Sequence, residues 1–380
     1  MAPRPDRELG LRLLVLQPTP FCNIDCAYCY LSDRQSRARM SLATLDRACS
    51  LVFGSGLVGP RLEVAWHGGE PLVVPLEWYE SAFELIAARC PPGVEIGHCF
   101  QTNGLLLDEG WARFFAQTKA SVGLSIDGPA DLHDANRRTR RGGGTHAGAM
   151  RAARLLEEQG VPFHVITVLT ERALDMPDEL FDFYVSSGIR EVGFNVEEIE
   201  GAHASSSLAG TEARFRRFIR RFFDLVWDSP ERIKVRELES ALSMALLDEP
   251  VVDEQNVPFA IVSVSVDGMV STFSPELLGA RSPRFESFAF GRVDSHRLSD
   301  IAIEPRFATI NSEIQAGVRA CERACPYFRW CGGGAPANKL FETGRFDSTE
   351  TMHCRLMRQV IFDEALRGFE RQFPSGVEAC

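Results

Sequence analysis

Residues 11–201 alternate between short apolar runs typical of strands and longer amphipathic runs typical of helices. The strand-like runs cover residues 11–19, 62–71, 96–104, 121–128, 162–170 and 191–201. Such alternation predicts a parallel sheet with helices outside it. Six units are too few for a closed eight-stranded barrel, so we predict an α/β fold, a partial (β/α)6 TIM-like barrel.

Polar or glycine-rich sequences follow four of these strand-like runs. They are CNIDCAYC (22–29), HGGEP (67–71), QTNG (101–104) and SIDGP (125–129). Active sites of such folds gather at the carboxyl ends of the strands. The four sequences are therefore expected to form one site.

Composition narrows the class of protein. The 380 residues carry 41 basic and 52 acidic side chains, a net charge of −11, which disfavours a nucleic-acid backbone as the main partner. No apolar run approaches the roughly 20 residues that cross a bilayer, and no signal peptide is visible, so we expect a cytoplasmic protein with no membrane partner. We place a barrel domain at 1–230, a bridging helix and linker at 231–257, and a C-terminal domain at 258–380.

The eleven cysteines are unevenly placed, and in a reducing compartment they are not expected to form disulfides. Four are scattered and receive no role: Cys49, Cys90, Cys99 and Cys380. The other seven form two groups. The N-terminal cysteines are Cys22, Cys26 and Cys29, and the C-terminal cysteines are Cys321, Cys325, Cys331 and Cys354.

The N-terminal cysteines supply three thiolates on a short loop. Zinc would require a fourth ligand, and none follows closely. A four-iron cluster held by three thiolates leaves one iron open for another ligand, as a catalytic cluster requires. The spacing therefore favours an iron–sulfur cluster over zinc.

CNIDCAYC resembles the CxxxCxΦC signature of the radical S-adenosylmethionine (SAM) enzymes, with Tyr28 as the aromatic residue. The resemblance implies a [4Fe–4S] cluster on the N-terminal cysteines that binds SAM and cleaves it to a 5′-deoxyadenosyl radical. GGE would receive the SAM amino group, SIDGP the ribose, and an arginine after it the SAM carboxylate. The residues implied to contact SAM are Tyr28, Gly68, Gly69, Glu70, Asn103, Ser125, Asp127 and Arg137. Taken singly, HGGEP and SIDGP are also ordinary turns, and Arg137 stands beside Arg138, Arg140 and Arg141 on a basic loop.

The C-terminal cysteines lie in a segment with few periodic runs, for which we expect little regular structure and a metal centre in place of a hydrophobic core. Their spacing alone does not separate zinc from an iron–sulfur cluster. The segment resembles the SPASM extension of radical SAM peptide maturases, which usually carries two auxiliary clusters. Here no Cys lies between Cys99 and Cys321, and Ala335 stands where a further Cys is usual. The resemblance thus implies one auxiliary [4Fe–4S] cluster, on Cys321, Cys325, Cys331 and Cys354.

This reduced pattern, with FSPELLG and CPYFRWCGGGAPANK, is similar to the cyclophane-forming, GrrM/OscB-like branch of these maturases. It implies a ribosomally made precursor peptide as substrate and a flavodoxin or ferredoxin as electron donor. A side-chain Cβ would lose a hydrogen and attack an aromatic ring. The auxiliary cluster could then take an electron, and Glu197, Glu198 or Glu276 a proton, although a solvated acidic residue is the more usual interpretation of any one of these glutamates.

Two other interpretations stay open at this point. One is a sulfatase maturase or a thioether-forming maturase, which shares the core motifs but usually keeps both auxiliary clusters. The other is a non-enzymatic iron–sulfur or zinc protein, which leaves the three-cysteine site unexplained.

The cysteine count predicts two four-iron clusters per chain. Protein reconstituted without oxygen should hold roughly eight iron atoms, because each cubane carries four. Iron and acid-labile sulfide analysis measures this number. A value near twelve would show that a third cluster has other ligands.

Overall fold

The computed structural model describes residues 10–246 and 250–373. One ten-stranded sheet runs through it in the order β14-β11-β10-β1-β3-β4-β5-β7-β8-β9. Its six central strands pair in parallel with their neighbours and match the six predicted runs. They are β1 (Leu11–Leu16), β3 (Val58–Trp66), β4 (Glu95–Thr102), β5 (Ser121–Ser125), β7 (Phe163–Leu169) and β8 (Glu191–Val196). The predicted α/β class with a mostly parallel sheet is confirmed, while the partial barrel stays a prediction.

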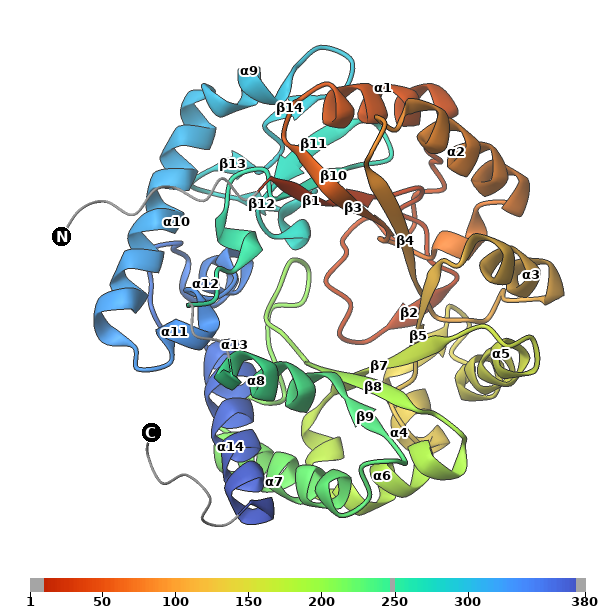
Figure 1. Ribbon diagram of the computed structural model, residues 1–380, viewed down its shortest axis with the longest axis vertical. Helices are drawn as coiled ribbons and strands as arrows, with labels where there is room; N and C mark the ends of the chain where they lie inside the picture. The colour runs from red at the N-terminus through yellow and green to blue at the C-terminus, as the bar shows by residue number, and fades with distance from the viewer. Residues whose placement is uncertain (1–9, 247–249, 374–380) are drawn as a thin grey trace.

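Helices lie on the outer side of these strands (Figure 1). They are α1 (Leu42–Phe53), α2 (Leu76–Arg89), α3 (Glu109–Thr118), α5 (His146–Glu158), α6 (Pro177–Ser186) and α7 (Glu212–Asp228). Local sequence sets where they begin. Ser41 caps α1 by accepting from the Thr44 amide, and Asp108 caps α3 by accepting from the Trp111 amide. Each helix buries an apolar face against the sheet, which leaves the strand ends as the open part of the fold.

The C-terminal part of the chain continues the same sheet. β10 (Ile261–Val264) pairs in parallel with β1, and β11 (Met269–Thr272) returns antiparallel to it. The two strands form a hairpin with Asp267-Gly268 in the connecting turn, where Gly268 takes a φ of +83°. Short strands complete this region: β14 (Gly291–Arg292) beside β11, and the separate pair β12 (Arg281–Ser282) and β13 (Glu286–Ser287).

Residues 231–257, predicted as a bridge, begin at the opposite edge of the sheet. β9 (Lys234–Val235) pairs with β8 and leads into α8 (Arg236–Leu246), which packs against β8 and α14. The proposed boundaries at 230 and 257 stay predictions. None of the helices in the described ranges is both long and apolar enough to span a membrane.

The expectation of little regular structure around the C-terminal cysteines was wrong. Their segment is mostly helical: α9 (Leu298–Ala302), α10 (Pro305–Ala324), α11 (Phe328–Cys331), α12 (Pro336–Thr343), α13 (Met352–Cys354), a π-helical turn (Arg355–Val360) and α14 (Ile361–Gln372). Phe307, Ile310, Leu340 and Phe346 are buried among these elements. Helices α11, α12 and α13 are short, and Gly332 and Gly344 in left-handed conformation and Pro336 separate them, so the sequence between Cys325 and Cys354 shows no long helical period.

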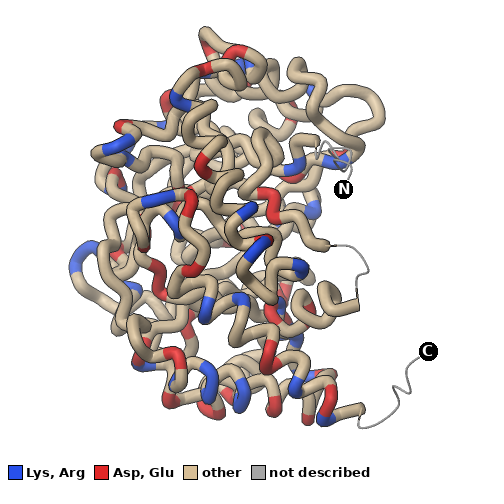
Figure 2. The backbone as a smooth tube through the Cα atoms, turned by 90° about the vertical axis from the view of Figure 1, so that its left-hand side faces the viewer, with Lys and Arg blue, Asp and Glu red and all other residues tan. Residues whose placement is uncertain are grey.

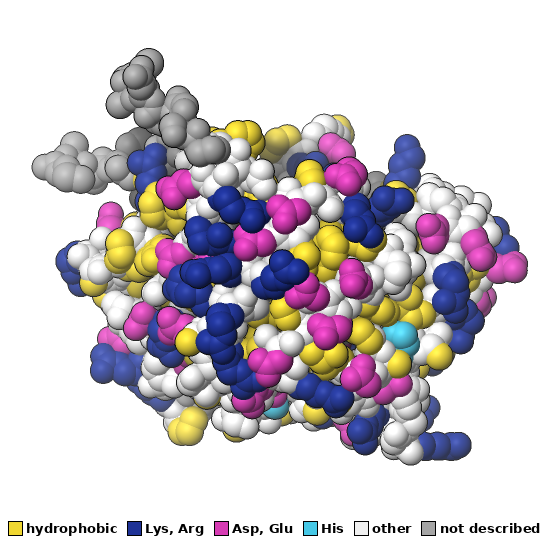
Figure 3. All heavy atoms as spheres, turned by 90° about the horizontal axis from the view of Figure 1, so that it is seen from below, with side chains coloured by type: hydrophobic (Ala, Val, Ile, Leu, Met, Phe, Trp, Pro, Cys, Tyr) yellow, Lys and Arg dark blue, Asp and Glu magenta, His cyan; other side chains and the backbone are white. Residues whose placement is uncertain are grey.

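Helix α7 buries an apolar face rich in phenylalanine and carries arginines on its other face. Arginines of this basic face contact α14, where the Glu364 carboxylate is 2% exposed and accepts hydrogen bonds from arginines of both helices. Figure 3 shows basic and acidic side chains interleaved on this side of the molecule, and Figure 2 shows both signs dispersed along α14 and its neighbours. Burial alone would raise the pKa of Glu364, but Arg220, Arg367 and Arg216 outweigh it and lower that pKa.

Replacing Glu364 with Gln should lower the free energy of unfolding by about 1–3 kcal/mol at neutral pH, because charge-assisted hydrogen bonds to the carboxylate are lost. A lowered folded pKa stabilises the fold above the ordinary carboxyl pKa, and this contribution is lost as pH falls through the folded value. The difference between Glu364→Gln and wild type in urea unfolding should therefore shrink on acidification. The matched control is Asp178→Asn, which removes a half-exposed ion pair with Arg221 and should lower the free energy of unfolding by at most about 1 kcal/mol.

Candidate active site

The N-terminal cysteines lie on the loop after β1, and a short strand from a later part of the chain pairs with this loop. Strand β2 (Ile24–Cys26) within this loop pairs antiparallel with β6 (Arg137–Thr139), which follows α4 (Ala130–Asn136). The register sets Cys26 opposite Arg137, and Arg137 Nη1 lies 3.9 Å from Cys26 Sγ. The three thiols line one cavity of about 480 Å³. The structure thus brings the three predicted ligands together at the strand ends.

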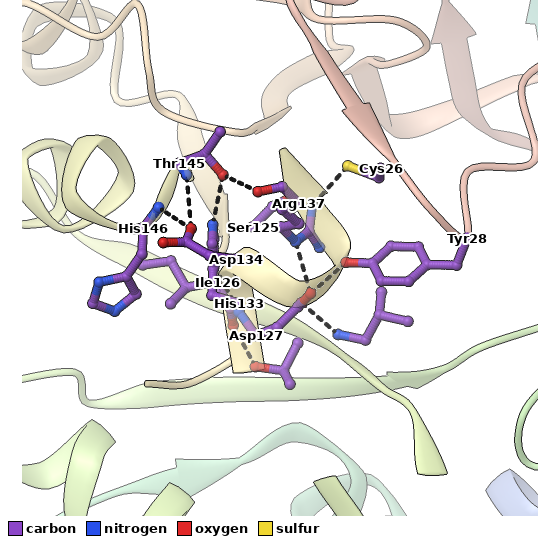
Figure 4. A network of polar contacts seen from close by, with 12 residues as sticks. Cys26, Tyr28, Ser125, Ile126, Asp127, His133, Asp134, Arg137, Thr145 and His146 are labelled. Carbon is purple, nitrogen blue, oxygen red and sulfur yellow. Dashed lines mark hydrogen bonds and ion pairs between the residues drawn. The ribbon is translucent and has the colours of Figure 1, made fainter. Parts of the chain in front are cut away.

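The Asp127 carboxylate, 3% exposed, connects the cysteine loop to the sheet (Figure 4). Its Oδ2 accepts from Arg137 Nε at 3.0 Å and from the Tyr28 hydroxyl, and its Oδ1 accepts from the Val168 amide at 3.0 Å. Burial disfavours the charged guanidinium, but Asp127 beside it raises the pKa of Arg137. Both carboxylate oxygens are engaged by the protein, so the structure gives Asp127 a positioning role. Its predicted contact with the ribose stays a prediction.

The structure separates Arg137 from its basic neighbours, which the sequence could not do. Arg137 is 6% exposed and lines the cavity, whereas Arg138 and Arg141 are exposed. Arg140 donates to the Cys22 carbonyl oxygen at 2.7 Å and supports the loop from outside. Ser125 also lines the cavity, where its hydroxyl accepts a hydrogen bond from Gln101. These placements agree with the predicted SAM contacts of Arg137 and Ser125.

Glu70 is a buried carboxylate with three protein donors. It accepts from the Leu72 amide at 3.0 Å, the Thr102 hydroxyl at 2.6 Å and the Asn103 amide at 2.8 Å. Burial raises its pKa, and these hydrogen bonds oppose the rise. Glu70 therefore joins the GGE turn to the end of β4 in addition to lining the cavity.

Close backbone packing requires the second glycine of the GGE turn. Gly69 has a φ of +64°, and a Cβ there would lie 2.5 Å from the Thr19 carbonyl oxygen. Gly69 lines the cavity with Glu70, while Gly68 lies behind them against Gln17. The predicted contact Asn103 also faces the cavity, and its side chain donates to Asn23 Oδ1 at 2.8 Å and approaches Cys22 Sγ at 3.9 Å.

The three candidate bases differ in their surroundings, although all line the cavity. The Glu197 carboxylate accepts from the Ser207 amide and hydroxyl and contacts His203. Glu198 accepts from Asn338, which opposes the upward shift of its pKa by burial. Glu276 has no side-chain partner within the described residues, and burial raises its pKa to about 7. Of the three, Glu276 is placed best to receive a proton.

Sequence reasoning missed several residues that line the same cavity: Tyr30, His67, Gln101, Asn195, Glu200 and Arg236. Tyr30 and His67 are hydrogen-bonded at 2.9 Å. Their position in the sequence could have identified them, because each lies in or next to one of the four strand-end sequences named above. Glu200 follows Glu197 and Glu198 in the same stretch, and nothing in the sequence marked it as facing inward.

The C-terminal cysteines surround a second cavity of about 320 Å³. Buried Lys339 donates to Cys321 Sγ at 3.5 Å, and Arg358 lines this cavity with its Nε buried and without a partner. Burial raises the pKa of Cys354 to about 12, so its thiolate requires a compensating positive charge. Four thiols with two cations around them fit an anionic iron–sulfur cluster.

A single metal ion is a poorer fit to either group. Across the two described ranges, no three His, Cys, Asp or Glu side chains converge closely enough to hold one ion. Each group of cysteines instead surrounds a cavity. Of the scattered cysteines that the structure describes, Cys49 lies in α1, Cys90 ends α2 and Cys99 lies in β4. None of these three lines either cavity.

Comparison with known proteins agrees with this geometry. Residues 16–198 match the family model of the radical SAM superfamily. An uncharacterized protein of Synechocystis sp. is 39% identical over 94% of this chain and 92% of its own length. The chain belongs to the radical SAM superfamily.

Other relatives match with lower identity. The serine-type anaerobic sulfatase-maturating enzyme of Klebsiella aerogenes is 32% identical over 53% of this chain and 50% of that enzyme. The structure of native anSMEcpe with bound AdoMet and Cp18Cys peptide aligns with a TM-score of 0.76 at 22% identity, covering 94% of this chain and 98% of the other. The structure of Streptococcus suis SuiB bound to precursor peptide SuiA aligns with a TM-score of 0.64 at 16% identity, and the alignment covers 91% of this chain and 76% of SuiB. These two likenesses show the fold.

Radical SAM enzymes use SAM and a [4Fe–4S] cluster, and the residues of the first cavity fit both. Burial raises the pKa of Cys22 to about 12 and that of Cys26 to about 11, so bound iron would be needed to hold them as thiolates. Arg137 and Glu70 both line this cavity, and their contacts with the SAM carboxylate and ammonium stay predictions. The second cluster stays a prediction.

Replacing Glu70 with Ala should lower the free energy of unfolding by about 3 kcal/mol, because three buried donors lose their acceptor. It should also weaken SAM binding, since the turn that lines the cavity loses its connection to β4. Urea unfolding and equilibrium binding of SAM measure the two effects. Glu84→Ala, on the exposed face of α2, should stay within about 0.5 kcal/mol of wild type. Equal stability of the two variants would contradict the bridging role.

Proposed function

We propose that this radical SAM enzyme matures a ribosomally synthesised precursor peptide by joining a side-chain Cβ to an aromatic ring, forming a cyclophane. The observation that carries the proposal is a three-thiol cavity that also contains Glu276, whose carboxylate has no side-chain partner in the part of the chain that the structure describes and is suited to accept the proton that such a coupling releases. The set of seven grouped cysteines supports it, because it provides for one auxiliary cluster where sulfatase maturases usually carry two.

Residues at different positions in the cavity have different roles in binding SAM and in positioning the cysteine loop. When bound, the catalytic cluster supplies the electron that cleaves SAM and so yields the radical that removes the Cβ hydrogen. Tyr28 and Asp127 hold Arg137 toward the SAM carboxylate, and the backbone of the GGE turn holds the ammonium. Asn103 keeps the cysteine loop against β4. This fixed geometry orients the reacting hydrogen and excludes solvent from it.

Ring closure requires one proton and one electron to leave the ring. Glu276 lies on a short turn at 275–277 and lines the same cavity as the N-terminal cysteines, and its raised pKa suits proton transfer near neutral pH. Lys339 and Arg358 would hold the auxiliary cluster, which when bound supplies an electron acceptor. An external flavodoxin or ferredoxin would reduce the catalytic cluster for each turnover.

A sulfatase-maturase activity is the second candidate, and the likeness to the Klebsiella enzyme favours it. The two products differ chemically, because a formylglycine carries an aldehyde and a cyclophane carries a new C–C bond. Reduced holoenzyme with SAM and the peptide encoded beside its gene should give 5′-deoxyadenosine and a peptide lighter by two hydrogens. That peptide should not react with a hydrazide probe and should show a bridged pair of residues on fragmentation. A hydrazide adduct would establish the sulfatase-type chemistry instead, and the variant with Cys22, Cys26 and Cys29 all replaced by Ala should give neither product.

Replacing Glu276 with Gln should lower the ratio of crosslinked peptide to 5′-deoxyadenosine by about 100-fold or more, the usual contribution of a positioned base. The base must be ionised to act, so the wild-type ratio should rise as pH increases through about 7. Glu276→Asp, which keeps a carboxylate, should retain part of the activity. A ratio that Glu276→Gln leaves unchanged would remove Glu276 from the mechanism.

A further inference from the structure

Five carboxylates line the catalytic cavity, and they differ in what neutralises them: Glu70, Glu197, Glu198, Glu200 and Glu276. Glu70 and Glu197 accept hydrogen bonds from protein amides and hydroxyls, and Glu198 accepts from Asn338. Glu276 is the proposed proton acceptor. Glu200 is the one of these five glutamates that has neither a hydrogen-bond partner for its carboxylate among the described residues nor a proposed role.

Glu200 is buried and has no donor to its carboxylate within the described residues. The residue is 7% exposed, and both Glu198 and Glu276 repel its charge, which together with burial raises its pKa well above the ordinary value. The guanidinium groups that line the cavity are engaged elsewhere. Arg137 holds Asp127, and Arg236 holds Glu237, the Phe194 carbonyl and Asn195. A buried carboxylate without a partner is costly, so this one points to a ligand that supplies a positive charge.

The backbone fixes Glu200 at the cavity wall. Its amide donates to the His203 carbonyl and its carbonyl accepts from the His203 amide, both at 2.8 Å. The next residue, Gly201, has a φ of +53°, and a Cβ there would lie 2.4 Å from the Tyr30 carbonyl oxygen. The Ala202 amide donates to that same oxygen at 2.9 Å. The turn at 200–203 is thus attached to the residue that follows Cys29, and the backbone that carries Glu200 is fixed at the wall of the catalytic cavity.

We propose that Glu200, with Glu198 beside it, binds the charged end of a lysine or arginine side chain of the substrate peptide. This inference rests on the proposed peptide substrate and adds a specificity determinant to it. An organic cation fits better than a metal ion, because the carboxylates do not converge closely enough to hold one ion. A charged side chain would donate hydrogen bonds to both carboxylates and would anchor the peptide beside the reacting centre.

The test measures binding by calorimetry, without turnover, to SAM-loaded holoenzyme. The probes are two capped tripeptides, acetyl-Gly-Lys-Gly-amide and acetyl-Gly-norleucine-Gly-amide, which differ in the terminal ammonium group. The lysine peptide should bind about tenfold to a hundredfold more tightly, as expected for a charge-assisted hydrogen bond. Glu200→Gln should remove this preference. Glu158→Gln, which removes the same charge from the exposed end of α5, should keep it.

Equal binding of the two peptides to the wild-type enzyme would overturn the proposal, and this comparison needs no variant that might fail to fold. A lysine preference that persists in Glu200→Gln would also overturn it. Free cadaverine is the third probe, and if it bound as tightly as the lysine peptide, the site would be one for small amines. The proposed function fails by a separate result, namely no modified peptide from wild-type enzyme that cleaves SAM.

Discussion

The charge balance at Asp127 is the constraint on which the catalytic site depends. This buried carboxylate is neutralised by Arg137 and hydrogen-bonded by Tyr28 and the Val168 amide, so its donors come from three separate segments of the chain. The cysteine loop itself has little regular structure beyond the three residues of β2. Its position therefore follows from the pairing of β2 with β6, from this buried ion pair, and from the hydrogen bonds that Arg140 and Asn103 donate to the loop. A loop fixed in this way presents its thiols to the cavity without a hydrophobic core of its own.

The sequence predicted the sheet well because each central strand is an apolar run bounded by glycine, proline or polar residues. It predicted that the four strand-end sequences form one site because parallel strands bring their carboxyl ends together. It failed around the C-terminal cysteines, where Gly332, Pro336 and Gly344 divide the helices into pieces too short to show a period. Among the glutamates at 197, 198 and 200, only tertiary packing decides which are satisfied by hydrogen bonds, and no local pattern carries that information.

The two groups of cysteines are linked by polar contacts at the edge of the catalytic cavity. Glu198 accepts from Asn338 and lies 3.8 Å from His353, and both partners also line the cavity of the C-terminal cysteines. A third cavity, of about 380 Å³, shares Asn195 and Arg236 with the first and Cys331 and His353 with the second. The helical C-terminal segment thus contacts the edge of the catalytic cavity through Asn338 and His353.

Electrostatics couples substrate binding to the proposed base. Glu200 and Glu276 repel each other inside one cavity, and Glu198 adds to the repulsion felt by both. A cation held by Glu200 would offset that repulsion and lower the pKa of Glu276, because a nearby positive charge favours the ionised carboxylate. A larger fraction of the base would then be ionised when a peptide with the correct charge occupies the cavity. By linkage, ionisation of Glu276 would strengthen binding of that peptide to the same degree. Peptide binding and deprotonation of the base would therefore be thermodynamically coupled.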